Sequence, residues 1–187
     1  MSPEDRRASI IAATLPLLRL YGRAVTTSQI AMAAGVAEGT LFRVFPDKDA
    51  LIDAAIASAF DSTPTEAELL RVDPALSLRD KLIEIAEILR RRIAQIWELI
   101  SILRIPAPLH ERQAPPSTAD DTRLRGLLAG VFEAHRDELR CEPEQAARLL
   151  RGLVFAGVHP RMTDKPLTSH EVVAVLLDGI RARDEEA

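Results

Sequence analysis

The residues with the clearest chemistry lie in the segment 26–51, TTSQIAMAAGVAEGTLFRVFPDKDAL. Ala31 is small where two helices would cross, and Gly35 permits the left-handed backbone of a tight turn. Val36 and Leu41 are apolar where the angle between those helices must be filled, so the segment meets the requirements of a helix-turn-helix. The second helix of such a unit is free to enter the major groove of DNA, and the chemistry to expect is recognition by hydrogen bonds and charge.

Side chains that could serve catalysis are few and are not arranged for it. The sequence has neither a glycine-rich phosphate loop nor a nucleophile elbow, and its four histidines lack metal-ligand spacing: His110, His135, His159 and His170. Cys141 is the only cysteine, which excludes an intrachain disulfide and suits a reducing compartment. We therefore expect no enzyme, no metal site and no cofactor.

The segment resembles the DNA-binding head of the tetracycline-repressor (TetR) family. In that family a threonine-capped helix, an A-G-V turn, a G-T-L-aromatic recognition helix and an F-P-x-K exit recur in this order, and all four are present here at matching intervals. The resemblance implies a dimeric DNA-binding transcriptional regulator. We expect a repressor that a small, largely apolar ligand releases from a palindromic operator in double-stranded DNA. The alternative is a constitutive DNA- or partner-binding helical protein with no ligand response.

The resemblance implies a role for each polar position. Thr27, just inside the second helix, would contact phosphate, and Gly39 would let the recognition helix approach the DNA backbone. Thr40 and Arg43 would face bases or phosphates, and Lys48 would donate to a phosphate from the start of the fourth helix. The DNA-binding residues expected in this way are Thr26, Thr27, Glu38, Gly39, Thr40, Phe42, Arg43 and Lys48.

Two positions depart from the commoner pattern of the family. Phe42 replaces a usual tyrosine and lacks one hydrogen bond to phosphate, and Glu38 stands where a basic residue often supplies positive charge. Glu38 either accepts from a cytosine amino group or adds favourable charge at a helix N-terminus. The second reading is the more conservative of the two.

Helical apolar spacing runs through nearly the whole chain, without the sustained alternation that a half-buried strand requires. We expect an all-α fold, with a three-helix head over residues 1–47 and a helical-bundle body for ligand binding and dimerisation over 48–187. Capping residues mark several helix starts: Ser2, Thr26 with Gln29, Asp47, Ser77 with Asp80, and Thr168 with Glu171.

The longest predicted helix follows Ser77 and reaches Leu103, and the proline-rich stretch from Pro106 to Ser117 is expected to be irregular. Three further helices are expected, over about 121–137, 143–158 and 168–183. The last two are so apolar that they need cover from two sides, which pairing with the same helices of a second copy would provide. The expected dimer residues are Leu150, Leu153, Val154, Val172, Leu176 and Ile180.

A ligand pocket in this family lies in the body, against the long central helix. The residues placed to line one here are Trp97, Phe132 and Phe155, with Arg104 or His135 as polar partners. Each of these aromatic side chains also fits an ordinary place in the core.

Charge and hydropathy narrow the classes of protein further. The net charge is -4, but residues 1–50 carry six basic and five acidic side chains, so the acidity belongs to the rest of the chain. No apolar run approaches the ~18 residues of a transmembrane helix, and the charged N-terminus has no apolar signal segment after it. We therefore expect a cytoplasmic protein without a membrane partner.

Overall fold

The computed structural model describes residues 2–104 and 118–180, apart from the side chains of residues 118–121 and 180. These residues divide into two compact units. The head contains residues 2–61 and 96–104, and the body contains residues 62–95 and 118–180. The head therefore includes, besides residues 1–47, the fourth helix and the end of a much later one.

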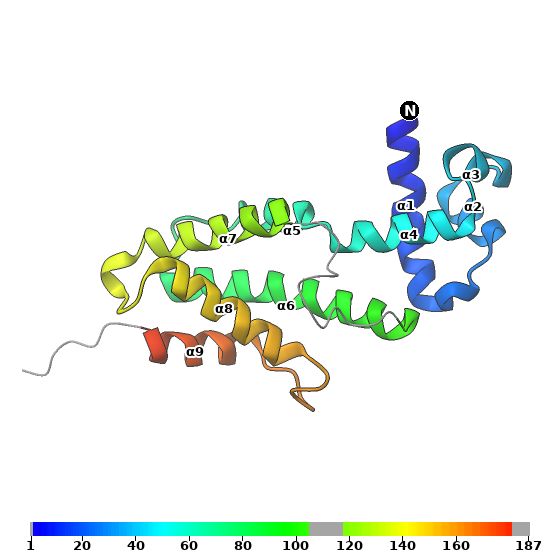
Figure 1. Ribbon diagram of the computed structural model, residues 1–187. Coiled ribbons are helices and arrows are strands. Elements are labelled where there is room, and N and C mark those ends of the chain that lie inside the picture. The colour runs from blue at the N-terminus through cyan, green and yellow to red at the C-terminus, as the bar shows by residue number, and fades with distance from the viewer. Residues whose placement is uncertain (1, 105–117, 181–187) are drawn as a thin grey trace, which may run out of the picture. The chain divides into compact units, whose positions relative to one another are not determined.

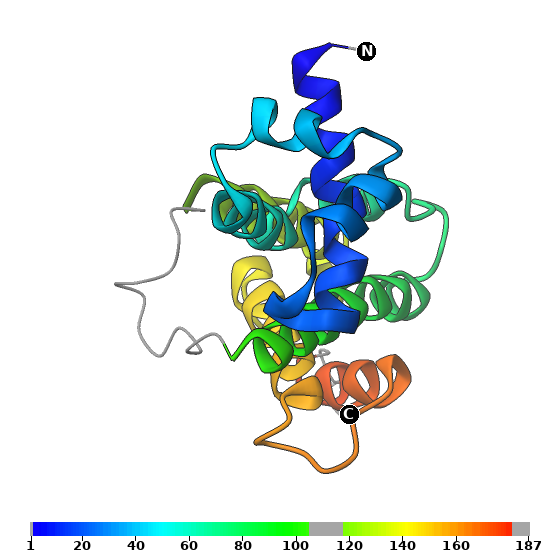
Figure 2. The ribbon, with the colours of Figure 1, turned by 90° about the vertical axis from the view of Figure 1, so that its right-hand side faces the viewer.

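The head is built from four consecutive helices and a short 3-10 turn (Figure 1). They are α1 (Pro3–Tyr21), η1 (Gly22–Ala24), α2 (Thr27–Ala34), α3 (Glu38–Val44) and α4 (Lys48–Phe60). Figure 2 shows α2 and α3, in lighter blue, packed beside α1 in dark blue. The head core joins all of these helices through fully buried side chains, among them Ile10, Leu18, Ile30, Leu41 and Ile52. Leu99 and Leu103, from the end of α6, complete this core.

The body contains the remaining helices. They are α5 (Thr63–Leu69), α6 (Leu78–Leu103), α7 (Thr118–Glu133), η2 (Arg136–Glu138), α8 (Pro143–Val158) and α9 (Ser169–Ile180). The body core contains Phe132, which is fully buried, together with Leu82 and Ile85 of α6 and Leu150 of α8. Leu176 and Leu177 bring α9 into the same core.

Local capping explains where these helices begin. Ser2 and Asp5 form a reciprocal capping box at α1, and Thr26 with Gln29 does the same at α2. Asp47 accepts from the backbone N–H of Ala50 at 2.8 Å and caps α4. The other predicted side-chain caps are formed by Ser77 with Asp80 at α6 and by Thr168 with Glu171 at α9. All five capping predictions are confirmed.

Two elements differ from the sequence prediction. The helix α5 was not predicted, because its Thr63-Pro64 start resembles a turn, although Pro64 occupies the first turn of a helix. The helix α7 ends at Glu133, earlier than expected, since the backbone N–H groups of His135 and Glu138 bond to carbonyls three residues before them.

The predicted all-helical fold, with a helix-turn-helix head and a helical body, is confirmed. In the described ranges, no helix is long and apolar enough to cross a membrane.

Candidate nucleic-acid interface

The turn between α2 and α3 fixes the angle of the recognition helix. Gly35 adopts φ 65° and ψ 32°, the left-handed conformation that side chains disfavour. Its backbone N–H donates to the carbonyl of Met32, and the N–H of Val36 donates to the carbonyl of Ala31 at 3.0 Å. Ala31 is itself buried, so the two helices meet over a small side chain as the sequence required.

One face of α3 holds it to the head and the other faces solvent. Leu41 is 1% exposed, and Phe45 just beyond the helix is 2% exposed. The guanidinium of Arg7 lies 4.4 Å from the centre of the Phe45 ring, which ties the start of α1 to the exit of α3. These contacts leave the opposite face of α3 free to meet a macromolecule.

The exposed residues of α3 are four that the sequence predicted for DNA binding: Glu38, Gly39, Phe42 and Arg43. Thr40 is half-buried, and Phe42 is 52% exposed although it is a large apolar residue. The prediction that these residues contact DNA is compatible with their positions on one short helix.

The other three predicted contacts lie beside α3. Thr26 uses its side chain to cap α2, whereas the hydroxyl of Thr27 donates to a carboxylate oxygen of Glu38. Lys48 donates from Nζ to the backbone carbonyl of Arg23 at 3.0 Å. An ammonium group has three donors, so this bond leaves Lys48 two for a phosphate.

The predicted ligand-binding residues belong to both compact units. Phe132 is fully buried in the body core, while Phe155 is 42% exposed on α8 and its ring packs at 5.3 Å from that of His159. His135 lies between Lys81 Nζ, at 3.1 Å, and the carboxylate of Glu138, at 2.8 Å. Trp97 and Arg104 belong to the head unit, Trp97 half-buried and Arg104 exposed.

The body nevertheless contains a small apolar cavity that the sequence did not identify. Its volume is about 90 Å³, and aliphatic side chains of α6, α7 and the end of α5 with the residue after it line the cavity: Leu69, Leu70, Ile85, Leu127, Leu128 and Val131. The cavity could be predicted from the sequence only if α5 was predicted first, and the start of α5 resembles a turn. An apolar lining of this kind suits an apolar ligand.

A buried acidic side chain lies on the same helix, α5. Glu66 is 3% exposed, and its carboxylate accepts from the Ser62 hydroxyl at 2.7 Å and pairs with Arg123 of α7 at 3.0 Å. Nothing in its sequence context distinguished Glu66 from a surface glutamate. The pair joins a buried carboxylate of α5 to an arginine side chain of α7 that is 68% exposed, so only the Glu66 side of the contact is desolvated.

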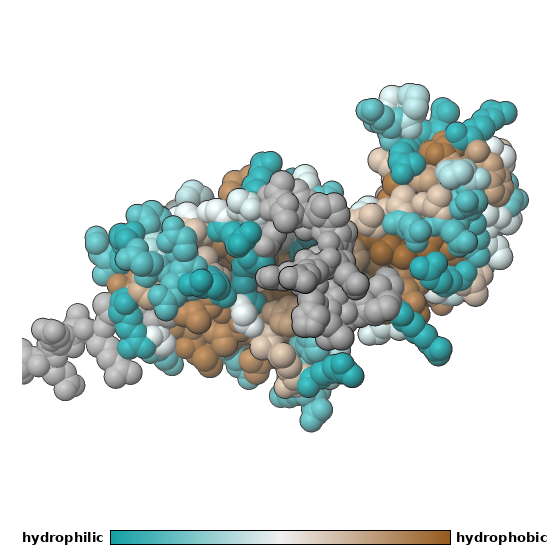
Figure 3. Space-filling model, viewed as in Figure 1, coloured by the Kyte–Doolittle hydropathy of each residue, from teal (hydrophilic) through white to brown (hydrophobic). Residues whose placement is uncertain are grey.

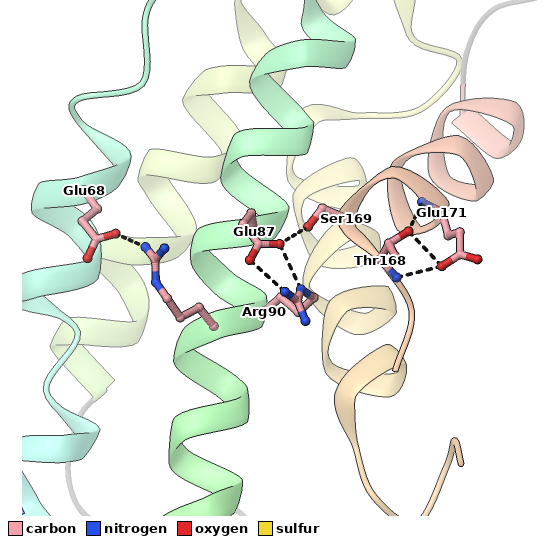
Figure 4. A network of polar contacts seen from close by, with 7 residues as sticks. Glu68, Glu87, Arg90, Thr168, Ser169 and Glu171 are labelled. Atoms are coloured by element: carbon pink, nitrogen blue, oxygen red, sulfur yellow. Dashed lines mark hydrogen bonds and ion pairs between the residues drawn. The ribbon is translucent and has the colours of Figure 1, made fainter. Parts of the chain in front are cut away.

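A polar network joins α6 to the start of α9 (Figure 4). The Ser169 hydroxyl donates to Glu87 at 2.6 Å, and Arg90 donates to both carboxylate oxygens of Glu87. The hydrogen bonds from Arg90, and after them the bond from Ser169, lower the pKa of the Glu87 carboxyl. Beside the network is an open groove of about 250 Å³, lined in part by Ile83, Pro166 and Leu167.

Four of the six predicted dimer residues are buried within a single chain, and the assignment of these residues to a dimer interface stays a prediction. Leu150, Val154, Val172 and Leu176 are at most 2% exposed and belong to the body core, with Leu153 packed against it; the side chain of Ile180 lies outside the described residues. A side chain already buried in its own core gains no contact area from a second copy.

Other apolar residues of α8 and α9 are exposed instead. Leu149 is 41%, Phe155 42% and Val175 59% exposed, and Gly152 and Gly179 are exposed near them in sequence. Figure 3 shows hydrophobic surface over the part of the body that contains α8 and α9. These two helices are therefore apolar on two faces, as the sequence indicated, and only the second face is available to a partner.

Comparisons with known proteins agree with the geometry of the head. Residues 10–55 match the family described as bacterial regulatory proteins, tetR family, a range that contains the helix-turn-helix. The chain is 26% identical over 162 residues to the nucleoid occlusion factor SlmA of Marinobacter nauticus, which is 85% of this chain and 74% of that protein.

Solved structures share the fold over nearly the whole chain. A TetR transcriptional regulator from Streptomyces coelicolor has a TM-score of 0.60 at 20% identity, covering 95% of this chain and 99% of that one. NalD, the secondary repressor of the MexAB-OprM multidrug efflux pump in Pseudomonas aeruginosa, has a TM-score of 0.54 at 21% identity, covering 96% and 98%.

Proposed function

The chain is a TetR-family DNA-binding transcriptional regulator, and we propose that it is a homodimeric repressor released from a palindromic operator by a small apolar ligand. The observation that carries the proposal is the exposed face of α3, set at a fixed angle by the left-handed turn at Gly35. Regulators of this family are not enzymes, so binding alone must account for the function.

Dimerisation would occur through the exposed apolar residues of α8 and α9. Leu149, Phe155 and Val175 are large enough to form the centre of an interface, and the exposed glycines Gly152 and Gly179 would let helices of two chains approach closely. In a twofold dimer the two α3 helices would read half-sites about 34 Å apart, or slightly more, which explains the expectation of a palindrome.

Ligand release would act through the body. The cavity lined by Leu69, Ile85 and Leu128 is small in the present conformation, and an apolar ligand that binds a more open form would stabilise that form. The helix α6 supplies Leu82 and Ile85 to the body core and Leu99 to the head core. A shift of α6 would therefore change the packing of both cores. Only unequal affinity of the ligand for the two conformations can change DNA binding.

A protein without a ligand response remains the second candidate. It is favoured by the similarity over 85% of this chain to a protein named as a nucleoid occlusion factor rather than as a repressor. In this reading the chain would bind DNA constitutively or together with a protein partner, and the cavity would be a packing defect.

The first experiment selects preferred sequences from random double-stranded DNA with the purified protein. A palindromic consensus is expected, and Arg43→Ala and Lys48→Ala are then compared on it. Loss of Arg43 should relax the preference at one position of each half-site if it touches a base, whereas loss of Lys48 should weaken binding to all sequences and flatten its salt dependence. Equal losses with an unchanged consensus would make Arg43 a phosphate contact.

The second experiment separates the two candidates. Trp97 is the only tryptophan, so its fluorescence reports on compounds that bind the protein. A hydrophobic compound that changes this fluorescence saturably should weaken operator binding over the same concentration range. Operator affinity that stays constant while the compound binds would favour the constitutive protein.

A further inference from the structure

A carboxylate on the exposed face of a recognition helix needs an explanation, because the surface it would approach is a polyanion. Glu38 is exposed at the first position of α3, and its carboxylate would be repelled by DNA phosphates. Among the described residues no arginine or lysine pairs with Glu38, so its charge is not neutralised within the head. Favourable contact with DNA therefore requires a donor on the DNA.

The structure holds this carboxylate in a defined orientation. The hydroxyl of Thr27, at the start of α2, donates to Oε1 of Glu38 and so joins the two helices across the turn. A hydroxyl has one proton, and that proton is engaged, so Thr27 cannot donate to a phosphate at the same time. Within the ranges 2–104 and 118–180 no hydrogen bond to Oε2 of Glu38 is found, so this oxygen can accept one from DNA.

The base edges in the major groove offer two kinds of amino donor. The cytosine N4 amino group stands without a neighbouring acceptor on its own base edge, whereas the adenine N6 amino group stands beside the acceptor N7. A carboxylate has acceptors only and would be repelled by N7, so it favours cytosine. A neutral amide has a donor and an acceptor and matches adenine at N6 and N7.

We propose that Glu38 is a specificity-determining residue that accepts a hydrogen bond from the N4 amino group of a cytosine in each half-site, and that Thr27 is its positioning residue. The inference rests on the DNA binding proposed above and assigns a base to one of its contacts. It also gives Thr27 a different role from the phosphate contact that the family resemblance implied.

The test repeats the selection from random DNA with wild-type protein and with Glu38→Gln, Thr27→Val and Glu4→Gln. Glu38→Gln should change the preference at one position of each half-site from cytosine to adenine, with discrimination on the order of tenfold in each direction. Thr27→Val removes the hydroxyl, so the preference for cytosine should weaken at the same position without changing to another base. Glu4→Gln, on α1, removes the same charge from the head and should leave the consensus unchanged.

Three results would contradict the proposal in distinguishable ways. If the wild-type protein selects no sequence, sequence-specific regulation fails and the role of Glu38 fails with it. If the wild type selects a palindrome but Glu38→Gln retains the same consensus and only binds all DNA more tightly, the carboxylate is a general repulsive charge and not a reader. If Thr27→Val leaves the discrimination at full strength, Thr27 does not position Glu38. Thermal melting of each variant verifies that the head is folded.

Discussion

At the scale of single residues, two glycines of the helix-turn-helix both have open space beside them, but their backbone conformations differ. A Cβ at Gly35 or at Gly39 would meet nothing within 4 Å, but only Gly35 has a positive φ, at 65°. Gly35→Ala should therefore lower the unfolding free energy by about 1–2 kcal/mol, because an L side chain is strained in this conformation. Chemical denaturation of the two alanine variants measures the difference.

Gly39→Ala is the matched variant, and we expect it to affect DNA binding rather than stability. Alanine is favoured over glycine in a helix, so the stability of this variant should be unchanged or higher by up to about 1 kcal/mol. If close approach of α3 to the DNA backbone depends on the missing side chain, operator affinity should nevertheless fall. Equal affinity of Gly39→Ala and wild type would show that this approach leaves room for a methyl group.

Residue-level predictions succeeded where the physics is local. The caps at Thr26, Asp47 and Thr168 involve residues three positions apart, so sequence alone specifies the partners. The assignment of residues to a dimer interface is not a local inference, and it stays a prediction. Apolar spacing shows that Leu150 and Leu176 are buried but does not tell whether their own chain or a second copy covers them.

At the scale of elements, the contact between α6 and α9 gives a pH dependence. Bonds from Arg90 and Ser169 hold the pKa of the Glu87 carboxyl below its ordinary value of 4.5. A lowered native pKa means that this carboxylate stabilises the fold above the unfolded pKa and that the contribution is lost as the pH falls through the native pKa. Glu87→Gln should therefore lower the melting temperature at pH 7, and its difference from wild type should shrink below about pH 4.5.

Melting curves between pH 7 and pH 3 test this prediction. Glu84→Gln, an exposed glutamate of the same helix, is the control and should give a smaller difference from wild type at pH 7. A Glu87→Gln deficit that remains constant down to pH 3 would mean that the ionised carboxylate contributes nothing beyond what an amide provides.

Element prediction from the sequence was limited by length. The helix α6, with 26 residues, carries many turns of apolar spacing and was predicted with its correct end at Leu103. The helix α5 has 7 residues, too few for a periodic pattern to emerge, and its burial depends on tertiary contacts such as that between Glu66 and Arg123. The apolar cavity was not predicted for the same reason, because the end of α5 contributes to its lining.

At the scale of the whole molecule, assembly can be separated from folding. Val175→Glu places a charge on an exposed face of α9, so the chain should remain folded and sediment as a monomer at micromolar concentration. Leu150→Glu buries the charge in the core and should yield unfolded or insoluble protein. Leu20→Glu, at a 73% exposed leucine of α1, should leave the dimer intact.

Analytical ultracentrifugation with far-UV circular dichroism distinguishes these outcomes. A folded Val175→Glu variant that still sediments as a dimer would move the interface away from this part of α9. Wild-type protein that sediments as a monomer would refute the dimer itself and, with it, the expected palindrome.

The composition of the head core has a consequence for modularity. Leu99 and Leu103 lie in that core, Glu98 pairs with Arg19 at 3.5 Å, and Ile102 lies against Gly22, all from a helix that begins after residue 77. A DNA-binding fragment that ends at residue 61 would lack the α6 side chains that complete its hydrophobic core. Chimaeras that exchange operator specificity between relatives must therefore transplant a discontinuous unit, with the end of α6 carried alongside the first four helices.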